Sequence, residues 1–327
     1  RYISVTGVQT CALPIYPSAI ETLITSRTRA ILCVHQVGMP CDLPAIAELA
    51  RKHGLRLVED AACASGSEIC IDGVWQKIGN PVGDVACFSF HPRKILTTGE
   101  GGMITTNDPT IDARCRLLRQ HGMSLSDLAR HSSSTVMVET YDEAGFNYRM
   151  TDLQASIGRV QLTRLDEIVA RRQSLAARYA ELLSVIPGIA IPQQPEWARS
   201  NWQSYTVGLP EGVDRELVMQ SMLDSSVATR RAVMSSHLEK PWRNARRGDL
   251  SRSEHVSGTH MILPLYSVMK GISPTYFRAA RSLGATPFIA FIKVYMPLTL
   301  PGIGAGDRKS TRLNSSHTDI SRMPSSA

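Results

Sequence analysis

The chain is 327 residues long and carries a formal net charge of +7 at pH 7. Residues 1–15, 270–306 and 307–327 contribute +1, +4 and +2 of that charge, so the central residues 16–269 are neutral overall. We therefore expect neither a nucleic-acid partner nor a polybasic membrane anchor. The central segment is long enough for one sizeable α/β core and a smaller second lobe.

Both ends of the chain carry a pattern that points to DNA rather than to a fold. One choice of codons turns residues 307–321 into a stretch that resembles a sequencing-library adapter, and the reverse complement of that stretch encodes residues 1–15 codon for codon. We therefore expect residues 1–15 and 307–327 to be non-native tails that take no part in the fold.

Six of the seven cysteines lie outside these tails, and none forms a CxxC pair or a zinc-ligand spacing. This usage is typical of a reduced, cytoplasmic protein without a bound metal. The apolar run near the start lies inside the adapter-like segment, so we expect no secretory signal.

From Ile20 to Thr106, short apolar runs alternate with helical stretches, which predicts a parallel sheet with crossover helices. Asp60 follows one of the predicted strands, at the sheet edge where open α/β folds bind ligands. The strands are predicted at residues 30–35, 55–58, 85–90 and 102–106, with a helix between the first two that Asp42 caps and Gly54 ends.

One long helix is predicted over residues 151–183, with several arginines exposed, and Pro187 and Pro192 follow its end. The remainder to Met269 mixes short strands with a helix near residues 217–223, and we assign it to the smaller lobe. The apolar side of the long helix is formed by Leu153, Ile157, Val160, Leu165 and Ile168.

Two frames carry the residues with the most distinctive chemistry. The first is Val-Glu-Asp-Ala-Ala-Cys-Ala at residues 58–64, and the second is Ser-Phe-His-Pro-Arg-Lys at residues 89–94, which runs into a Thr-Thr-Gly-Glu-Gly-Gly loop. Asp60 at a strand end can keep the pyridine nitrogen of pyridoxal phosphate (PLP) protonated, and Lys94 can form a Schiff base with its aldehyde. The sequence therefore favours catalysis over simple binding.

Each of these residues also has a plainer interpretation. Lys94 could be a solvated surface lysine, and Asp60 a helix cap after a strand. Ser89 could be a buried serine bonded to backbone, and Cys63 a small core residue. A bare turn would account for the glycines at 99, 101 and 102 nearly as well as close approach to a cofactor.

Residues 16–269 resemble the DegT and StrS type of PLP-dependent sugar aminotransferases. The resemblance rests on the two frames and on three further stretches: His-Gln-Val-Gly-Met-Pro at 35–40, Arg-Gln-His-Gly-Met at 119–123, and Gly-Phe-Asn-Tyr-Arg-Met-Thr-Asp-Leu-Gln-Ala at 145–155. It implies the aspartate aminotransferase-like fold, PLP fold type I, with a mostly parallel sheet flanked by helices. The large PLP-binding domain would cover residues 16–186, truncated at its N-terminus, and a smaller α+β lobe residues 187–269.

The resemblance also implies roles for the residues of the two frames. Lys94 would form the Schiff base and then move a proton between substrate and cofactor, while Asp60 would pair with the ring nitrogen. Ser89 would donate its hydroxyl to the cofactor phosphate. Cys63 would lie near the ring, where many members of the family carry glutamine or histidine.

Four more residues are assigned through the resemblance alone. Asn147 and Arg149 would reach the phosphate or substrate in the neighbouring subunit, which implies a homodimer; the alternative is that this stretch only begins a helix. Arg230 and His237 resemble a substrate-side stretch, although either could be an ordinary exposed residue.

The implied function is transfer of an amino group, from glutamate, to a keto-sugar nucleotide in polysaccharide, lipopolysaccharide or secondary-metabolite sugar biosynthesis. A PLP-dependent sugar dehydratase of the same fold is the first alternative. In the dehydratases that the chain resembles, however, a histidine replaces the Schiff-base lysine, so Lys94 argues against this alternative. A transporter fragment is the second, because residues 270–306 resemble the cytoplasmic coupling loop of an ABC-transporter permease, without a membrane span. We interpret the junction between residues 16–269 and residues 270–306 as chimeric.

The family places about a hundred residues ahead of the strand at Ala30, including a Gly-Thr turn that holds the cofactor phosphate at a helix N-terminus. No such turn is found in this chain. We therefore expect the chain as given to bind PLP weakly or not at all, and to be weakly active or inactive.

Overall fold

The computed structural model describes residues 2–5, 17–125, 133–225, 227–242, 244 and 248–265. The permease-like segment at 270–306 and the tail at 307–327 lie outside these residues, as does most of the tail at 1–15. None of the helices within the described ranges combines the length and the apolar character that a membrane span requires.

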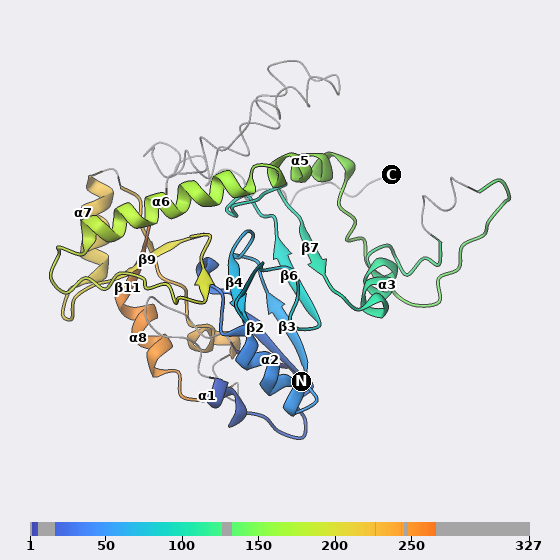
Figure 1. Cartoon of the computed structure of the whole chain (residues 1–327), viewed down its shortest axis with the longest axis horizontal. Helices are drawn as coiled ribbons and strands as arrows, with labels where there is room; N and C mark the ends of the chain where they lie inside the picture. The colour runs from blue at the N-terminus through green and yellow to red at the C-terminus, as the bar shows by residue number, and fades with distance from the viewer. Residues whose placement is uncertain are drawn as a thin grey trace, which may run out of the picture.

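A five-stranded sheet, in the order β1-β2-β3-β6-β7, lies at the centre of the molecule (Figure 1). Its first four strands in that order are parallel, and β7 runs antiparallel to β6 at one edge. The strands are β1 (Tyr2–Val5), β2 (Ala30–Val34), β3 (Arg56–Asp60), β6 (Val85–Ser89) and β7 (Gly102–Thr105).

The four strands predicted from apolar runs are thus confirmed, while β1 falls in the stretch expected to be a tail. A free sheet edge offers unpaired backbone groups, and the Tyr-Ile-Ser-Val sequence of β1 has high β-propensity. These two properties account for its pairing with β2.

Helix α2 (Leu43–Lys52) is the predicted crossover between β2 and β3, and it follows the short elements α1 (Pro17–Glu21) and η1 (Gln36–Gly38). The carboxylate of Asp42 accepts a hydrogen bond from the backbone N–H of Ala45, as the capping prediction requires. The buried face of α2, including Ile46 and Leu49, packs against Ile31 and Leu57 of the sheet in one hydrophobic core. Burial of this face fixes the two strands that lead to Asp60.

The connection from β3 to β6 is not a crossover helix, as the alternating pattern suggested, but a hairpin of β4 (Glu68–Ile71) and β5 (Val74–Lys77). The turn residues Asp72 and Gly73 both have positive φ, 50° and 79°, which matches a two-residue Asp-Gly hairpin turn. β4 also pairs with β8 (Ala198–Arg199), so a distant part of the chain joins this small sheet.

The single long helix predicted over residues 151–183 is wrong: the chain forms α5 (Asp152–Leu162) and α6 (Leu165–Leu183). At the break, the Thr163 hydroxyl donates to the Val160 carbonyl oxygen at 2.8 Å, competing with the helical backbone pattern. Arg171 and Arg178 are exposed as expected, but Arg172 is buried with only 4% of its surface exposed.

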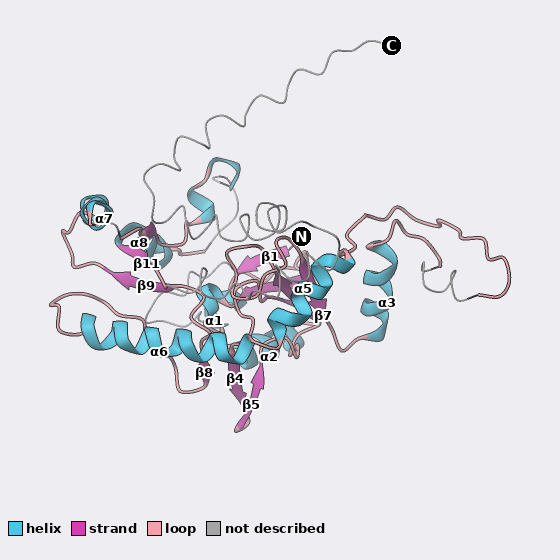
Figure 2. Ribbon diagram, turned by 90° about the horizontal axis from the view of Figure 1, so that it is seen from above, coloured by secondary structure: helices cyan, strands magenta, loops and turns pink. Residues whose placement is uncertain are grey.

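The C-terminal part contains an antiparallel sheet in the order β10-β11-β9. Its core joins buried residues of β9 and β11 to one side of α6, which runs from this sheet toward α5 (Figure 2). The remaining elements are α3 (Pro109–Leu118), β9 (Tyr205–Gly208), α7 (Arg215–Asp224), β10 (Arg230–Arg231), η2 (Ser236–Leu238), η3 (Lys240–Trp242), α8 (Ser251–Thr259) and β11 (His260–Leu263).

Candidate active site

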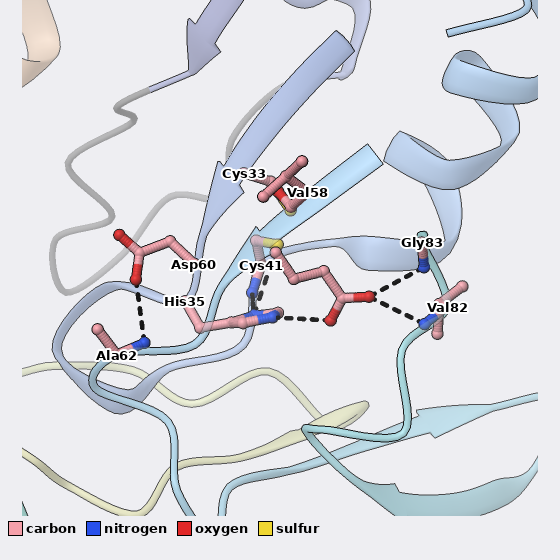
Figure 3. A network of polar contacts seen from close by, with 9 residues as sticks. Cys33, His35, Cys41, Val58, Asp60, Ala62, Val82 and Gly83 are labelled. Atoms are coloured by element: carbon pink, nitrogen blue, oxygen red, sulfur yellow. Dashed lines mark hydrogen bonds and ion pairs between the residues drawn. The ribbon is translucent and has the colours of Figure 1, made fainter. Parts of the chain in front are cut away.

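Asp60 and Ser89 end two neighbouring parallel strands, β3 and β6, at the same edge of the central sheet. One carboxylate oxygen of Asp60 accepts the backbone N–H of Ala62 at 3.0 Å (Figure 3). Among the described residues, the other carboxylate oxygen accepts no hydrogen bond and no cation pairs with it. The acid therefore keeps one oxygen available to a ligand.

Lys94 reaches the loop that follows Asp60. Its amine donates a hydrogen bond to the Cys63 sulfur at 3.1 Å, and both side chains are partly buried. Within the described part of the chain no carboxylate forms an ion pair with this amine. We name Asp60, Cys63, Ser89 and Lys94 the strand-end cluster.

Among the described residues, the Ser89 hydroxyl donates its proton to no partner. Within the same set, its oxygen accepts one long hydrogen bond, 3.5 Å, from the His91 N–H. In the neighbouring strand register, Cys87 lies opposite Asp60. Burial, and after it the charge of Asp60, raises the pKa of the Cys87 thiol, so Cys87 stays neutral beside the acid.

The glycine loop after Lys94 is explained by protein contacts. A Cβ on Gly101, whose φ is 153°, would lie 2.7 Å from the Thr98 hydroxyl oxygen, and a Cβ on Gly102 would lie 2.7 Å from the Phe88 carbonyl oxygen. The turn interpretation therefore accounts for both residues.

A buried polar network supports β3 one residue before Asp60. The Glu59 carboxylate accepts the N–H groups of Val82 and Gly83, both at 2.9 Å, and contacts Nε2 of His35 at 3.3 Å. His35 Nδ1 accepts the Cys41 N–H at 3.2 Å (Figure 3), so this imidazole carries its proton on Nε2 and donates it to Glu59. His35 and Glu59 are both 0% exposed.

This network reaches Asp60 through the backbone, because the His35 N–H donates to the Asp60 carbonyl oxygen at 3.0 Å. The network therefore fixes the end of β2, the end of β3 and the loop that enters β6. Sequence analysis assigned no role to Glu59 or His35, although the adjacent acids Glu59 and Asp60 at a strand end must point to opposite faces.

The other predicted site residues lie elsewhere. Asn147 and Arg149 are exposed on the segment between α3 and α5, and Arg149 Nε donates to the Asn147 side-chain oxygen at 3.3 Å. Arg230 is exposed in β10. His237 is buried, with its Nε2 2.8 Å from a Glu254 carboxylate oxygen. As far as the described residues extend, Asn147, Arg230 and His237 make no hydrogen bond to the strand-end cluster.

Two residues that sequence analysis missed contact the loops of the strand-end cluster. The Asn201 side chain donates to the Cys63 carbonyl oxygen at 2.8 Å, and the Gln203 side chain bonds the backbone on both sides of Lys94. The only sequence signal for them is a polar Ser-Asn-Trp-Gln-Ser run just before the β9 strand.

The family model described as the DegT/DnrJ/EryC1/StrS aminotransferase family matches residues 5–274, so the chain belongs to this family. It is 37% identical over 251 residues to GDP-perosamine synthase from Caulobacter vibrioides, covering 76% of this chain and 64% of that protein. It is 33% identical over 264 residues to the spore coat polysaccharide biosynthesis protein SpsC from Bacillus subtilis, covering 79% and 67%. The chain thus spans about two thirds of the length of these relatives.

The structure resembles that of the aminotransferase TlmJ from Streptoalloteichus hindustanus, with a TM-score of 0.67, 32% sequence identity, and coverage of 81% of this chain and 68% of the other. The predicted fold, PLP fold type I with a mostly parallel sheet and flanking helices, is confirmed. The family depends on PLP, which confirms the cofactor predicted for it.

The residues of the strand-end cluster fit this cofactor. PLP needs an acid for its ring nitrogen, an amine for its aldehyde and hydrogen-bond donors for its phosphate. Where the structure describes the chain, Asp60 has one carboxylate oxygen without a partner, the Lys94 amine pairs with no acid, and the Ser89 hydroxyl has a proton to donate. Each chemical requirement therefore has a residue at the same edge of the sheet.

Proposed function

We propose that this protein is a PLP-dependent aminotransferase that transfers an amino group, from glutamate, to a keto-sugar nucleotide. The observation that supports this most directly is the contact of the Lys94 amine with Cys63, three residues beyond the strand-end acid Asp60. The amine, from the loop after β6, thus contacts the loop that follows the acid at the end of β3, as a ring cofactor bound by both groups requires.

When bound, PLP would supply the electron sink for bond breaking next to the amino group. Asp60 would hold a proton at the ring nitrogen, and Ser89 would donate its hydroxyl to the phosphate. Lys94 would hold the cofactor and then act as the base that moves a proton. Cys63, which accepts from the Lys94 amine, would keep that amine directed toward the ring.

The substrate class is proposed from the relatives. GDP-perosamine synthase is named for a nucleotide sugar, and SpsC for spore coat polysaccharide biosynthesis. Arg149, Arg230 and His237 are proposed on the substrate side, and Asn147 on the cofactor side, as the family resemblance implies. The presence of Lys94 counts against the dehydratase alternative.

The test is reduction with borohydride after incubation with PLP, followed by peptide mass spectrometry. We expect the label at Lys94 in excess over Lys77, and we expect it to vanish in Lys94→Ala but to persist in Lys77→Ala. Equal labelling of both lysines would overturn the assignment. A strong PLP absorbance band that depends on Lys94 would instead overturn the expectation of weak binding.

A homodimer is part of the proposal. The edge strand β7 and residues 133–150 before α5, which extend away from the sheet in Figure 2, expose apolar and aromatic side chains. Phe146 and Tyr148 stack on each other with ring centroids 5.0 Å apart, yet are 54% and 74% exposed. A second copy of the chain would cover them. Sedimentation should give a dimer that Tyr148→Glu dissociates; a monomeric wild-type chain would contradict this.

The organisation of the chain is proposed on sequence pattern alone: a large domain at 16–186, a small lobe at 187–269, a permease-like piece at 270–306, and adapter-derived tails. A cytoplasmic location is proposed on the cysteine pattern. Resequencing the source DNA across residues 260–280 and both ends tests the chimeric joint. A single uninterrupted gene across that joint would refute it.

A further inference from the structure

The Gln203 side chain spans the two peptide groups that flank Lys94. Its amide oxygen accepts the Ile95 N–H at 3.0 Å, and its amide nitrogen donates to the Arg93 carbonyl oxygen at 2.8 Å. One rigid amide therefore fixes the backbone immediately before and after the lysine. Because the direction of a side chain follows from its backbone, this clamp sets where the Lys94 amine can reach.

Asn201 connects the other half of the site to the same segment. Its side-chain nitrogen donates to the carbonyl oxygens of Cys63 at 2.8 Å and Ser65 at 2.9 Å, and its side-chain oxygen accepts the Gln203 N–H at 2.8 Å. Asn201 is 0% exposed. The loop after Asp60 and the loop of Lys94 are therefore tied to one another through residues 200–204, which we name the bridging segment.

The bridging segment is itself fixed from outside the site. Arg172 of α6 donates to the Trp202 carbonyl oxygen at 2.7 Å, and burial lowers the pKa of this arginine to about 10, still charged at neutral pH. Trp202 has a φ of 51°, a left-handed conformation that is rare for a bulky residue. A buried charge and a strained residue are retained where the surrounding structure fixes them firmly.

Ile95 adds a packing anchor beside the clamp. It is 8% exposed and lies in a small core with Leu165 and Val169 of α6. Side-chain packing holds Ile95, and among the described residues Gln203 is the one side chain that hydrogen-bonds both peptide groups around Lys94. The two hydrogen bonds of Gln203 and the packing of Ile95 together hold the Lys94 loop.

We propose that Gln203 is a positioning residue for Lys94, holding the lysine amine toward Cys63 and the cofactor through its two backbone hydrogen bonds. This inference rests on the proposed PLP chemistry at Lys94. The amide oxygen and the amide nitrogen of Gln203 both bond to backbone, so its role is to position the lysine rather than to contact the substrate.

The test compares Gln203→Met with Gln194→Met in the full chain. Methionine conserves the side-chain volume but makes neither hydrogen bond. Gln194 is a matched control: among the described residues its amide oxygen accepts one hydrogen bond, at 2.8 Å, from the N–H of Ser200 in the bridging segment. After PLP and borohydride treatment, we expect Gln203→Met to lower the label at Lys94 by about five- to tenfold, with labelling of Lys77 unchanged. Gln194→Met should label Lys94 as the wild type does.

Hydrogen–deuterium exchange gives a second readout that does not need the cofactor. The Ile95 amide should exchange faster in Gln203→Met than in the wild type or in Gln194→Met. Wild-type labelling of Lys94 together with unchanged exchange at Ile95 in Gln203→Met would overturn the inference. If wild-type Lys94 is not labelled in excess but exchange at Ile95 still accelerates, the cofactor assignment fails while the clamp stands.

Discussion

Replacing Glu59 with glutamine should destabilise the protein although it changes one atom. The glutamine oxygen can still accept the N–H groups of Val82 and Gly83, but its NH₂ group then faces the Nε2–H of His35. His35 cannot change its tautomer without losing the Cys41 N–H, which its Nδ1 accepts. Two buried donors are left facing one another, and two charge-assisted bonds become neutral, so we expect a loss of about 2–4 kcal/mol.

The assay is thermal unfolding followed by circular dichroism, where that loss corresponds to a decrease in Tm of roughly 3–8 °C for a chain of this size. The control is Glu21→Gln, which breaks an exposed contact with Lys52 and should leave Tm nearly unchanged. A Glu59→Gln protein whose Tm equals that of the wild type would show that the buried carboxylate is not needed by its three donors.

Three further predictions concern local features. Burial lowers the pKa of His260 to about 4, so its contribution to stability is present above about pH 6.5 and is lost as the pH falls toward 4. His260→Gln should remove up to about 3 kcal/mol of this pH dependence from the free energy of unfolding, measured by urea unfolding at pH values across the window. Gly38→Ala should lower the free energy of unfolding by about 2–5 kcal/mol, because φ is 97° and the new Cβ would overlap the bridging segment. In the control Gly54→Ala, where φ is 61° and no atom lies within 4 Å of the new Cβ, urea unfolding should show a loss of only about 1–2 kcal/mol. Asp214→Ala removes the side-chain acceptor for the Leu217 N–H at the start of α7 and should cost about 1 kcal/mol by the same assay, with recovery in Asp214→Ser.

Four of the five strands of the central sheet, all but β1, and half of the candidate site could be predicted from local patterns. The strands of the sheet are short apolar runs, and chain direction alone places Asp60 and Ser89 at one edge. The single helix over 151–183 was wrong because hydrophobic periodicity continues across Thr163, while the hydroxyl bond that favours the break leaves no periodic signal.

The other half of the site depends on contacts that no local pattern encodes. Gln203 is 108 residues from Ile95, and Asn201 is 138 residues from Cys63. A side-chain amide that bonds to a distant backbone group does not recur at a regular sequence spacing, so no pattern in a single sequence reveals it. Arg172 was unexpected in the core for a related reason, since its partner is a carbonyl group of a distant loop rather than an acid.

Synthesis from the ribosome adds a temporal order to this arrangement. The strands that present the acid and the lysine are complete once the chain has passed Thr105, yet the amides that hold their loops are made about a hundred residues later. A nascent chain arrested before position 200 would thus lack the side-chain amides that restrain both loops of the strand-end cluster. The final quarter of the described residues therefore completes the proposed site, although it contributes no member of the cluster.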